Sequence, residues 1–86
     1  MWDWDEDKRQ ANLVKHGVDF DDVWLITWAS AKAFPDLRRD YGEPRFKVLG
    51  LIGERLFVVI YTPCGENRRL IGLRKANARE IEEWLM

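Results

Sequence analysis

The sequence has few of the residues that cross-link small proteins or bind metal ions. It contains one cysteine, Cys64, and one histidine, His16. A single cysteine forms no internal disulfide, and one cysteine with one histidine does not make a zinc-binding cluster. We therefore expect no metal and no other cofactor, and a fold that depends on its own apolar core or on a partner.

Long hydrophobic runs are also missing. The longest apolar run, residues 56–61, is far shorter than the roughly 20 residues that a membrane-spanning helix needs. The first residues, Met1-Trp2-Asp3-Trp4-Asp5, contain neither the basic segment nor the apolar core of a secretory signal. The sequence predicts a cytoplasmic protein with no membrane partner.

Charge is balanced overall but unevenly distributed along the chain. Residues 31–75 carry ten basic and five acidic side chains, a local net charge of +5, whereas residues 1–30 carry three basic and seven acidic ones. A basic middle can form one cationic face that attracts a phosphate backbone. The alternative is an ordinary solvated β-surface with arginines on its outer side.

Length and residue patterns predict one domain, residues 1–86, with two N-terminal helices and one C-terminal helix. Asp5 and the acidic residues after it suit the start of a helix that ends before Gly17, which tolerates the left-handed conformation. A second helix is predicted over residues 20–28, with Asp19 as its cap. A third is predicted over residues 76–86, where apolar residues recur at helical spacing.

The segments between these helices have an extended pattern. Strands are predicted over residues 45–52, 55–62 and 68–74, joined by short turns into an antiparallel meander. Residues 31–34 and 2–4 are candidates for further short strands. The expected fold class is therefore α+β: two N-terminal helices, an antiparallel sheet of three to four strands and a C-terminal helix. With helices over one sheet face, the other face is free for a ligand or a partner.

Five stretches, in this order, resemble the BrnT-type toxins. Together they cover nearly the whole chain, and the run from Asp40 to Arg45 is the most specific of them. The stretches are Trp4-Asp5 with Lys8, Asn12 and Lys15-His16-Gly17; Phe20; Asp40-Tyr41-Gly42-Glu43-Pro44-Arg45; Tyr61-Thr62; and Arg69 with Arg74-Lys75-Ala76-Asn77, leading into Glu80.

The resemblance implies a RelE-like fold and a ribonuclease toxin of a type II toxin–antitoxin system. Such a toxin halts growth by cleaving RNA, with or without the ribosome. The implied partners are an RNA substrate and a BrnA-like antitoxin that neutralises the toxin. The antitoxin also binds operator DNA, and the toxin is associated with DNA only through the antitoxin. A homodimer and a heterotetramer with the antitoxin are the assemblies to consider.

The sequence departs from the family pattern at two positions. Cys64 stands where members of the family commonly have an arginine, and Gly72 stands where they commonly have a serine. An arginine lost near a phosphate site removes a fixed positive charge, and the lost serine removes a hydroxyl donor. An alternative function therefore stays open: a catalytically degenerate toxin homologue that acts as a protein-interaction and autoregulatory module.

RNA cleavage of this class needs no metal. The ribose 2′-hydroxyl attacks the adjacent phosphorus while a base removes its proton, a cation stabilises the developing charge and an acid protonates the leaving oxygen. His16 is a candidate for proton transfer because only histidine titrates near neutral pH unaided; its alternative role is to cap a helix. Glu43 is the other candidate base, and its alternative role is an ion pair with Arg45.

Three arginines, Arg45, Arg69 and Arg74, are candidates for stabilising the transition state, because arginine stays charged and can bind a phosphate through two hydrogen bonds. Arg69 and Arg74 are five positions apart and point to opposite faces of a regular strand. Both can serve one site only if a bulge intervenes or if Arg74 lies beyond the strand end. Solvent exposure and core packing are the alternatives for the candidate RNA-binding residues, which are Lys15, Lys47, Lys75 and Tyr61.

Overall fold

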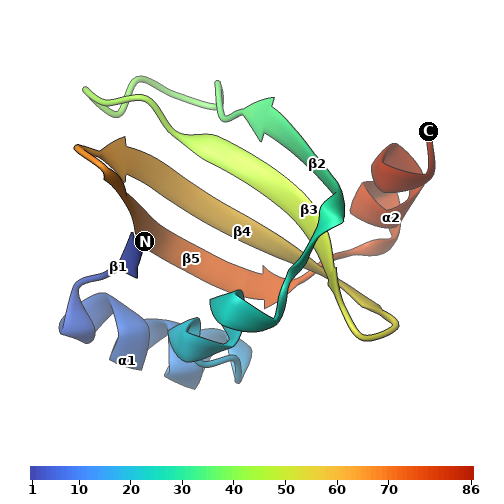
Figure 1. Cartoon of the computed structure of the whole chain (residues 1–86), viewed down its shortest axis with the longest axis horizontal. Coiled ribbons are helices and arrows are strands. Elements are labelled where there is room, and N and C mark those ends of the chain that lie inside the picture. Colours follow the sequence, from blue (N-terminus) through green and yellow to red (C-terminus); the bar gives the residue numbers. More distant parts are fainter.

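The computed structural model describes residues 1–86 and has a five-stranded sheet with helices on both faces (Figure 1). Its order is β1-β5-β4-β3-β2, with β1 parallel to β5 and all other neighbours antiparallel. The α+β class is confirmed, but the purely antiparallel sheet of three to four strands is wrong. The elements are β1 (Trp2–Asp3), α1 (Glu6–His16), the 3-10 helix η1 (Phe20–Leu25), β2 (Thr27–Pro35), β3 (Phe46–Ile52), β4 (Arg55–Cys64), β5 (Asn67–Lys75) and α2 (Ala78–Leu85).

Helix α1 begins and ends where its capping residues predict. The side chain of Asp5 accepts a hydrogen bond from the backbone N–H of Asp7, and Gly17 takes the left-handed conformation with φ of 68°. Helix α2 begins directly after Asn77. The Asn77 side chain accepts a hydrogen bond from the backbone N–H of Glu80, and the Glu80 side chain accepts one from the backbone N–H of Asn77. None of the helices has the length and apolar character needed to cross a membrane.

The second predicted N-terminal helix is wrong: one α-helix is followed by the six-residue 3-10 helix η1. Asp19 caps it as predicted. Phe20 and Val23, three residues apart, are fully buried, and a 3-10 helix places such residues on the same side. The chain then leaves the helix, so that Ile26 is buried too, while Trp24 stays 55% exposed. Burial of Phe20, Val23 and Ile26, which are three residues apart, therefore decides the conformation here against the α-helix that the apolar spacing over residues 20–28 predicted.

Strand β2 is longer than the predicted strand over residues 31–34 and lies at one edge of the sheet (Figure 1). Its register with β3 shifts between Thr27 and Lys32, so the pairing is interrupted in this part. Near this interruption the Ile26 side chain approaches Gly50 of β3 closely. A Cβ atom on residue 50 would lie 2.8 Å from the Cγ2 atom of Ile26. Glycine at position 50 therefore lets the segment between η1 and β2 cross the sheet.

Helices cover one face of the sheet and part of the other, so the expectation of a wholly free second face is wrong. On the first face, hereafter the α1 face, η1 lies over a buried cluster that includes Val59, Leu70 and Leu73, and α1 packs beside this cluster against β5. On the second, the α2 face, Trp84 of α2 packs against a smaller cluster that includes Leu49 and Val58. Helix α2 is only eight residues long, and basic side chains of β3 and β5 occupy the rest of the α2 face.

A β-bulge in β5 determines which side chains face the site. Ile60 of β4 pairs with Gly72, but Tyr61 pairs with Leu70, so Ile71 is the extra residue. Directly paired residues share a sheet face. Because Thr62 pairs with Arg69 and Val58 pairs with Arg74, both arginines lie on the α2 face. The sequence required a bulge to place Arg69 and Arg74 on the same face of the sheet, and this bulge is present in β5.

Candidate active site

Helix α1 is attached to the free edge of β5 by the side chain of Asn12. Its amide nitrogen donates hydrogen bonds to the carbonyl oxygens of Val18 and Leu73, and its amide oxygen accepts one from the N–H of Leu73. Asn12 is buried, and it satisfies the two backbone groups of Leu73 that a further strand would otherwise pair. This attachment fixes the helix relative to the strand.

The same face of α1 carries the chain's single histidine. Lys8, Asn12 and His16 are spaced four residues apart, so they lie on one side of the helix. With Gly72 and Ile71 of β5, they line a hollow of about 270 Å³ that also contains Lys15. Asn12 therefore holds a basic residue and a histidine against the bulged part of β5.

His16 is exposed and lies among cations. Partial desolvation lowers the pKa of His16 below its usual value of 6.5, and repulsion by Lys15 and Arg74 lowers it further. A lowered pKa keeps the imidazole neutral at pH 7, which is the form that accepts a proton. The electrostatics of this end of α1 therefore suit a general base better than an acid.

A second hollow, of about 170 Å³, adjoins the first, since Lys8 and Ile71 line both. It extends over β5 and β4 to the segment just before β3, and it brings Glu43, Arg45 and Arg69 together. We call the two adjoining hollows the α1–β5 groove. Its lining residues are Asp5, Lys8, Ala11, Asn12, Lys15, His16, Glu43, Arg45, Thr62, Arg69, Leu70, Ile71 and Gly72.

Arg45 is the least engaged arginine of this groove. Its Nε atom is buried and donates no hydrogen bond, and its ion pair with Glu43 is long, at 3.7 Å. By contrast, Arg38 and Arg74 each bind a carboxylate through two nitrogen atoms. A guanidinium with unused donors is suited to bind a phosphate in two places. The predicted ion pair between Glu43 and Arg45 is present but weak.

Arg69 lies on β5 and has one hydrogen bond to an acidic side chain. Its Nε atom donates to Asp3 of β1 at 3.2 Å, and its side chain is half exposed. Asp3 raises the pKa of Arg69, with smaller contributions from nearby Cys64 and Glu43. Arg69 is thus permanently charged and close to Glu43, and most of its donors stay free for a ligand.

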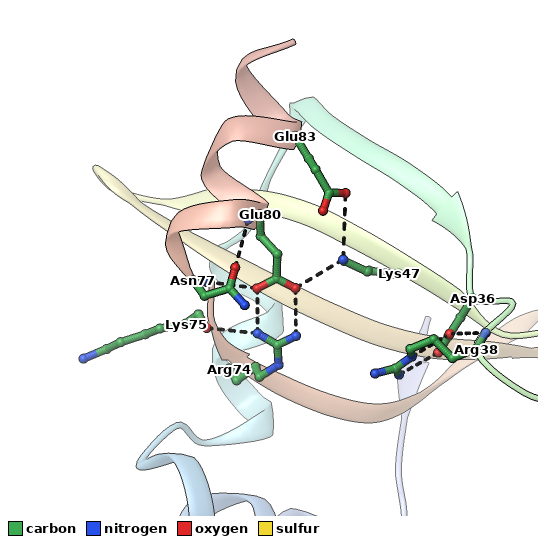
Figure 2. Close-up of polar contacts among 8 residues, drawn as sticks. All are labelled: Asp36, Arg38, Lys47, Arg74, Lys75, Asn77, Glu80 and Glu83. Carbon is green, nitrogen blue, oxygen red and sulfur yellow. Dashed lines mark hydrogen bonds and ion pairs between the residues drawn. The ribbon is translucent and has the colours of Figure 1, made fainter.

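Arg74 lies on the α2 face in a polar cluster that Figure 2 shows. Its two terminal nitrogens donate to the two carboxylate oxygens of Glu80, both at 2.8 Å. Lys47 lies 3.2 Å from the same carboxylate and 4.0 Å from Glu83. These contacts, Arg74 foremost, lower the pKa of Glu80 to about 2. The cluster borders a separate hollow of about 300 Å³, whose three cations, Arg38, Lys47 and Arg74, are already paired.

The structure therefore brings five of the nine predicted site residues into the groove and leaves four elsewhere. Lys47 belongs to the Glu80 cluster, and Lys75 is exposed, with its side chain pointing away from that cluster (Figure 2). Tyr61 is on the α1 face, where its ring stacks on Phe46 at 5.5 Å. Arg74 is outside the lining but close enough to act on His16 by charge. The predicted residues in the groove are Lys15, His16, Glu43, Arg45 and Arg69.

Sequence reasoning named no role for three residues that build this site. Lys8 and Asn12 could have been found from their four-residue spacing with His16 on one helix face. Glu80 could have been identified as the partner of Asn77 in a capping box. Its two additional ion pairs depend on strands far from α2 in the sequence.

Of the two departures from the family pattern, one lies in the groove and the other lies outside its lining. Gly72 lines it beside His16, and a Cβ atom there would meet only Ile60 atoms at 3.9 Å, an ordinary contact. Cys64 is exposed at the end of β4, near Arg69. A serine at position 72 would add a hydroxyl to the groove, and an arginine at position 64 would add a charge near Arg69.

A small α+β domain whose groove is lined by a histidine, two lysines and two arginines has the features of a protein that acts on a phosphate-bearing chain. Residues 4–80, most of the chain, match the family described as the ribonuclease toxin BrnT of type II toxin–antitoxin systems. The chain therefore belongs to the BrnT family of ribonuclease toxins, as the resemblance predicted. A toxin of a type II system implies an antitoxin partner. A comparison with curated proteins gave no match.

Proposed function

We propose that this toxin binds RNA in the α1–β5 groove and cleaves it there by metal-independent acid–base chemistry. The observation that carries this proposal is the state of Arg45, which lines the groove beside Arg69 and donates no hydrogen bond to the protein. Two arginines with free donors can hold the scissile phosphate and stabilise the charge that develops on it. Lys8 and Lys15 extend this positive surface along α1.

His16 is the proposed base. In the reaction, the ribose 2′-oxygen forms a bond to phosphorus, the bond from phosphorus to the 5′-oxygen breaks, and the 2′-hydroxyl proton passes to the neutral imidazole. The leaving oxygen takes a proton from water, to which this open groove gives access. Arg74 assists through charge, since it lowers the pKa of His16 while bound to Glu80.

Glu43 is the alternative base, and a pH profile separates the two residues. If His16 is the base, the cleavage rate falls as the pH drops through the lowered pKa of His16, since the protonated ring accepts no proton. If Glu43 is the base, the rate does not follow the titration of His16, and Glu43→Gln removes cleavage instead. A His16→Gln variant that keeps the wild-type profile would exclude His16 as the base.

The role of Arg45 is tested by cleavage of RNA with purified wild type, Arg45→Ala and Arg45→Lys. Loss of a fixed cation at the developing charge should lower kcat by about 10²–10³-fold, and lysine should restore little because it lacks the two-pronged geometry. Arg55→Ala is the matched control, because Arg55 is exposed at the start of β4, away from the groove. Equal activity of Arg45→Ala and wild type would refute the proposed site.

The proposed protein partner is a BrnA-like antitoxin that neutralises the toxin and connects it to operator DNA. Membership of a type II toxin family supports this proposal. Expression of the toxin alone should arrest growth, and co-expression of the antitoxin encoded beside it should restore growth. Continued growth with abundant folded toxin would count against a toxic activity.

The second candidate function is a catalytically degenerate toxin that serves as an interaction and autoregulatory module. The presence of Gly72 and Cys64 in or beside the groove favours it. Such a protein binds the antitoxin tightly but does not cut RNA. Gain of cleavage by a Cys64→Arg, Gly72→Ser double variant of an inactive wild type would support this reading, and a wild type that already cleaves RNA would refute it.

A further inference from the structure

A fourth hollow, of about 310 Å³, adjoins the α1–β5 groove at Arg45 and Glu43, which line both. It is formed by the loop between β2 and β3, and its volume is at the lower end of the range for small-molecule pockets, roughly 300–1,000 Å³. Its other lining residues are Pro35, Asp36, Leu37, Arg39, Asp40, Tyr41, Pro44 and Phe46. Whatever occupies this hollow therefore lies next to the proposed phosphate site.

The hollow contains a stacking surface made of an aromatic ring and planar cations. The guanidinium carbon of Arg45 lies 3.9 Å from the centroid of the Tyr41 ring, and that of Arg39 lies 5.2 Å from it. The Tyr41 hydroxyl donates to Asp36 at 3.4 Å, and Arg38 binds the same buried carboxylate through two nitrogens. These bonds fix the loop. Unpaired bases stack on aromatic rings and on arginine planes of this kind.

The rim of the hollow carries carboxylates with free oxygens. Asp40 is exposed; its Oδ1 atom accepts the N–H of Gly42 at 2.9 Å, and its Oδ2 atom has no hydrogen-bond partner. Glu43 makes only the long ion pair with Arg45. Carboxylates are acceptors only, so they select a ligand edge that presents hydrogen-bond donors.

We propose that this hollow binds an unpaired guanine base of the RNA, adjacent to the phosphate held in the groove; the inference rests on the proposed function. Guanine presents two neighbouring donors, N1–H and the N2 amino group, which match the two oxygens of one carboxylate. Adenine and cytosine present an acceptor beside their amino group, and uracil presents one N–H between two carbonyls, so each would face a carboxylate with an acceptor. Asp40 is the residue to which we assign this selection.

The test uses single-stranded oligomers with one guanosine among adenosines and uridines, and the same oligomers with inosine, which lacks the N2 amino group. Binding is measured on 2′-fluoro versions of the oligomers, which cannot be cleaved because they lack the 2′-hydroxyl. Cleavage is measured on the ribose versions. Wild type should bind the inosine oligomer about tenfold more weakly, as expected for a hydrogen bond to a charged group. Asp40→Asn should bring the two affinities close together, because the variant keeps the acceptor for Gly42 but loses the charge.

Asp21→Asn is the matched control: Asp21 is an exposed aspartate of η1 that lines none of these hollows, so this variant should keep the tenfold ratio. Equal binding of the two oligomers by wild type would overturn the inference, while cleavage of the ribose oligomers would leave the proposed function standing. Guanosine-selective binding without cleavage would support the inference and refute the proposed function. If Asp40→Asn weakens binding of the antitoxin but keeps the preference for guanosine, the hollow is a protein-docking site and the inference is wrong.

Discussion

Replacement of Glu80 by glutamine should destabilise the protein strongly, because this carboxylate is 5% exposed and lies among three partners. It binds Arg74 through two hydrogen bonds of 2.8 Å, lies 3.2 Å from the Lys47 ammonium and accepts the backbone N–H of Asn77. In Glu80→Gln the amide removes the negative charge and points an N–H₂ group at one of the cations. Arg74 then loses its counter-charge, and Lys47 keeps only the 4.0 Å ion pair with Glu83.

The magnitude follows from the pKa of Glu80. Its partners lower this pKa from 4.5 to about 2, and each pKa unit corresponds to about 1.4 kcal/mol, so the ionised form contributes about 3 kcal/mol. Since the pKa in the folded state is the lower one, this contribution is complete above about pH 5 and is lost as the pH falls toward 2; less than half remains at pH 3. In a domain of this size, 3 kcal/mol corresponds to a Tm decrease of roughly 10–25 °C at neutral pH.

The assay is urea unfolding of wild type and Glu80→Gln at pH 7, 5 and 3, followed by tryptophan fluorescence. Glu82→Gln is the control, because Glu82 is exposed on the same helix and has no ion pair. The difference between wild type and Glu80→Gln should be about 3 kcal/mol at pH 7 and shrink at pH 3, whereas Glu82→Gln should stay within about 0.5 kcal/mol of wild type. A difference that is constant from pH 7 to pH 3 would refute the electrostatic reasoning and assign the loss to packing.

Three further outcomes are expected. Asn12→Ala should cost about 2–4 kcal/mol in urea unfolding, because both backbone groups of Leu73 lose a buried partner; full stability would show that water or a neighbour replaces the amide. Gly50→Ala should lower the free energy of unfolding by about 1–3 kcal/mol, because its methyl group would lie 2.8 Å from a methyl carbon of Ile26, and a neutral result would mean that this contact relaxes freely. NMR titration should give a pKa below 6.5 for His16, and a value above that would contradict its placement among cations.

The parts of the fold that follow from local chemistry were predictable from the sequence. The capping residues Asp5 and Gly17 determine α1, and Asn77 determines the start of α2. The second helix was mispredicted because the burial of Phe20, Val23 and Ile26 against the distant sheet decides the conformation there, and helical periodicity alone carries no information about that sheet. The parallel pairing of β1 with β5 joins residues at opposite ends of the chain, which no local pattern reveals.

The candidate site was predictable in its residue types but not in its arrangement. The sequence supplied His16, Glu43, Arg45 and Arg69. It also showed that Arg69 and Arg74 could serve one site only with a bulge between them or with Arg74 beyond the strand end. The existence of that bulge depends on how Leu70 and Leu73 both enter the core, which is a property of packing across strands. The capture of Arg74 by Glu80 likewise depends on where α2 folds back over the sheet.

The stacked indoles of Trp2 and Trp28 have a consequence for the curvature of the sheet. They belong to β1 and β2, its two opposite edges, yet their ring centroids are 5.6 Å apart. The sheet thus curls far enough for side chains of its two edges to meet, although a closed β-barrel would join them by backbone hydrogen bonds. Truncation of the N-terminal segment before α1 therefore removes the two-residue strand and also uncovers the Trp28 indole of the opposite edge.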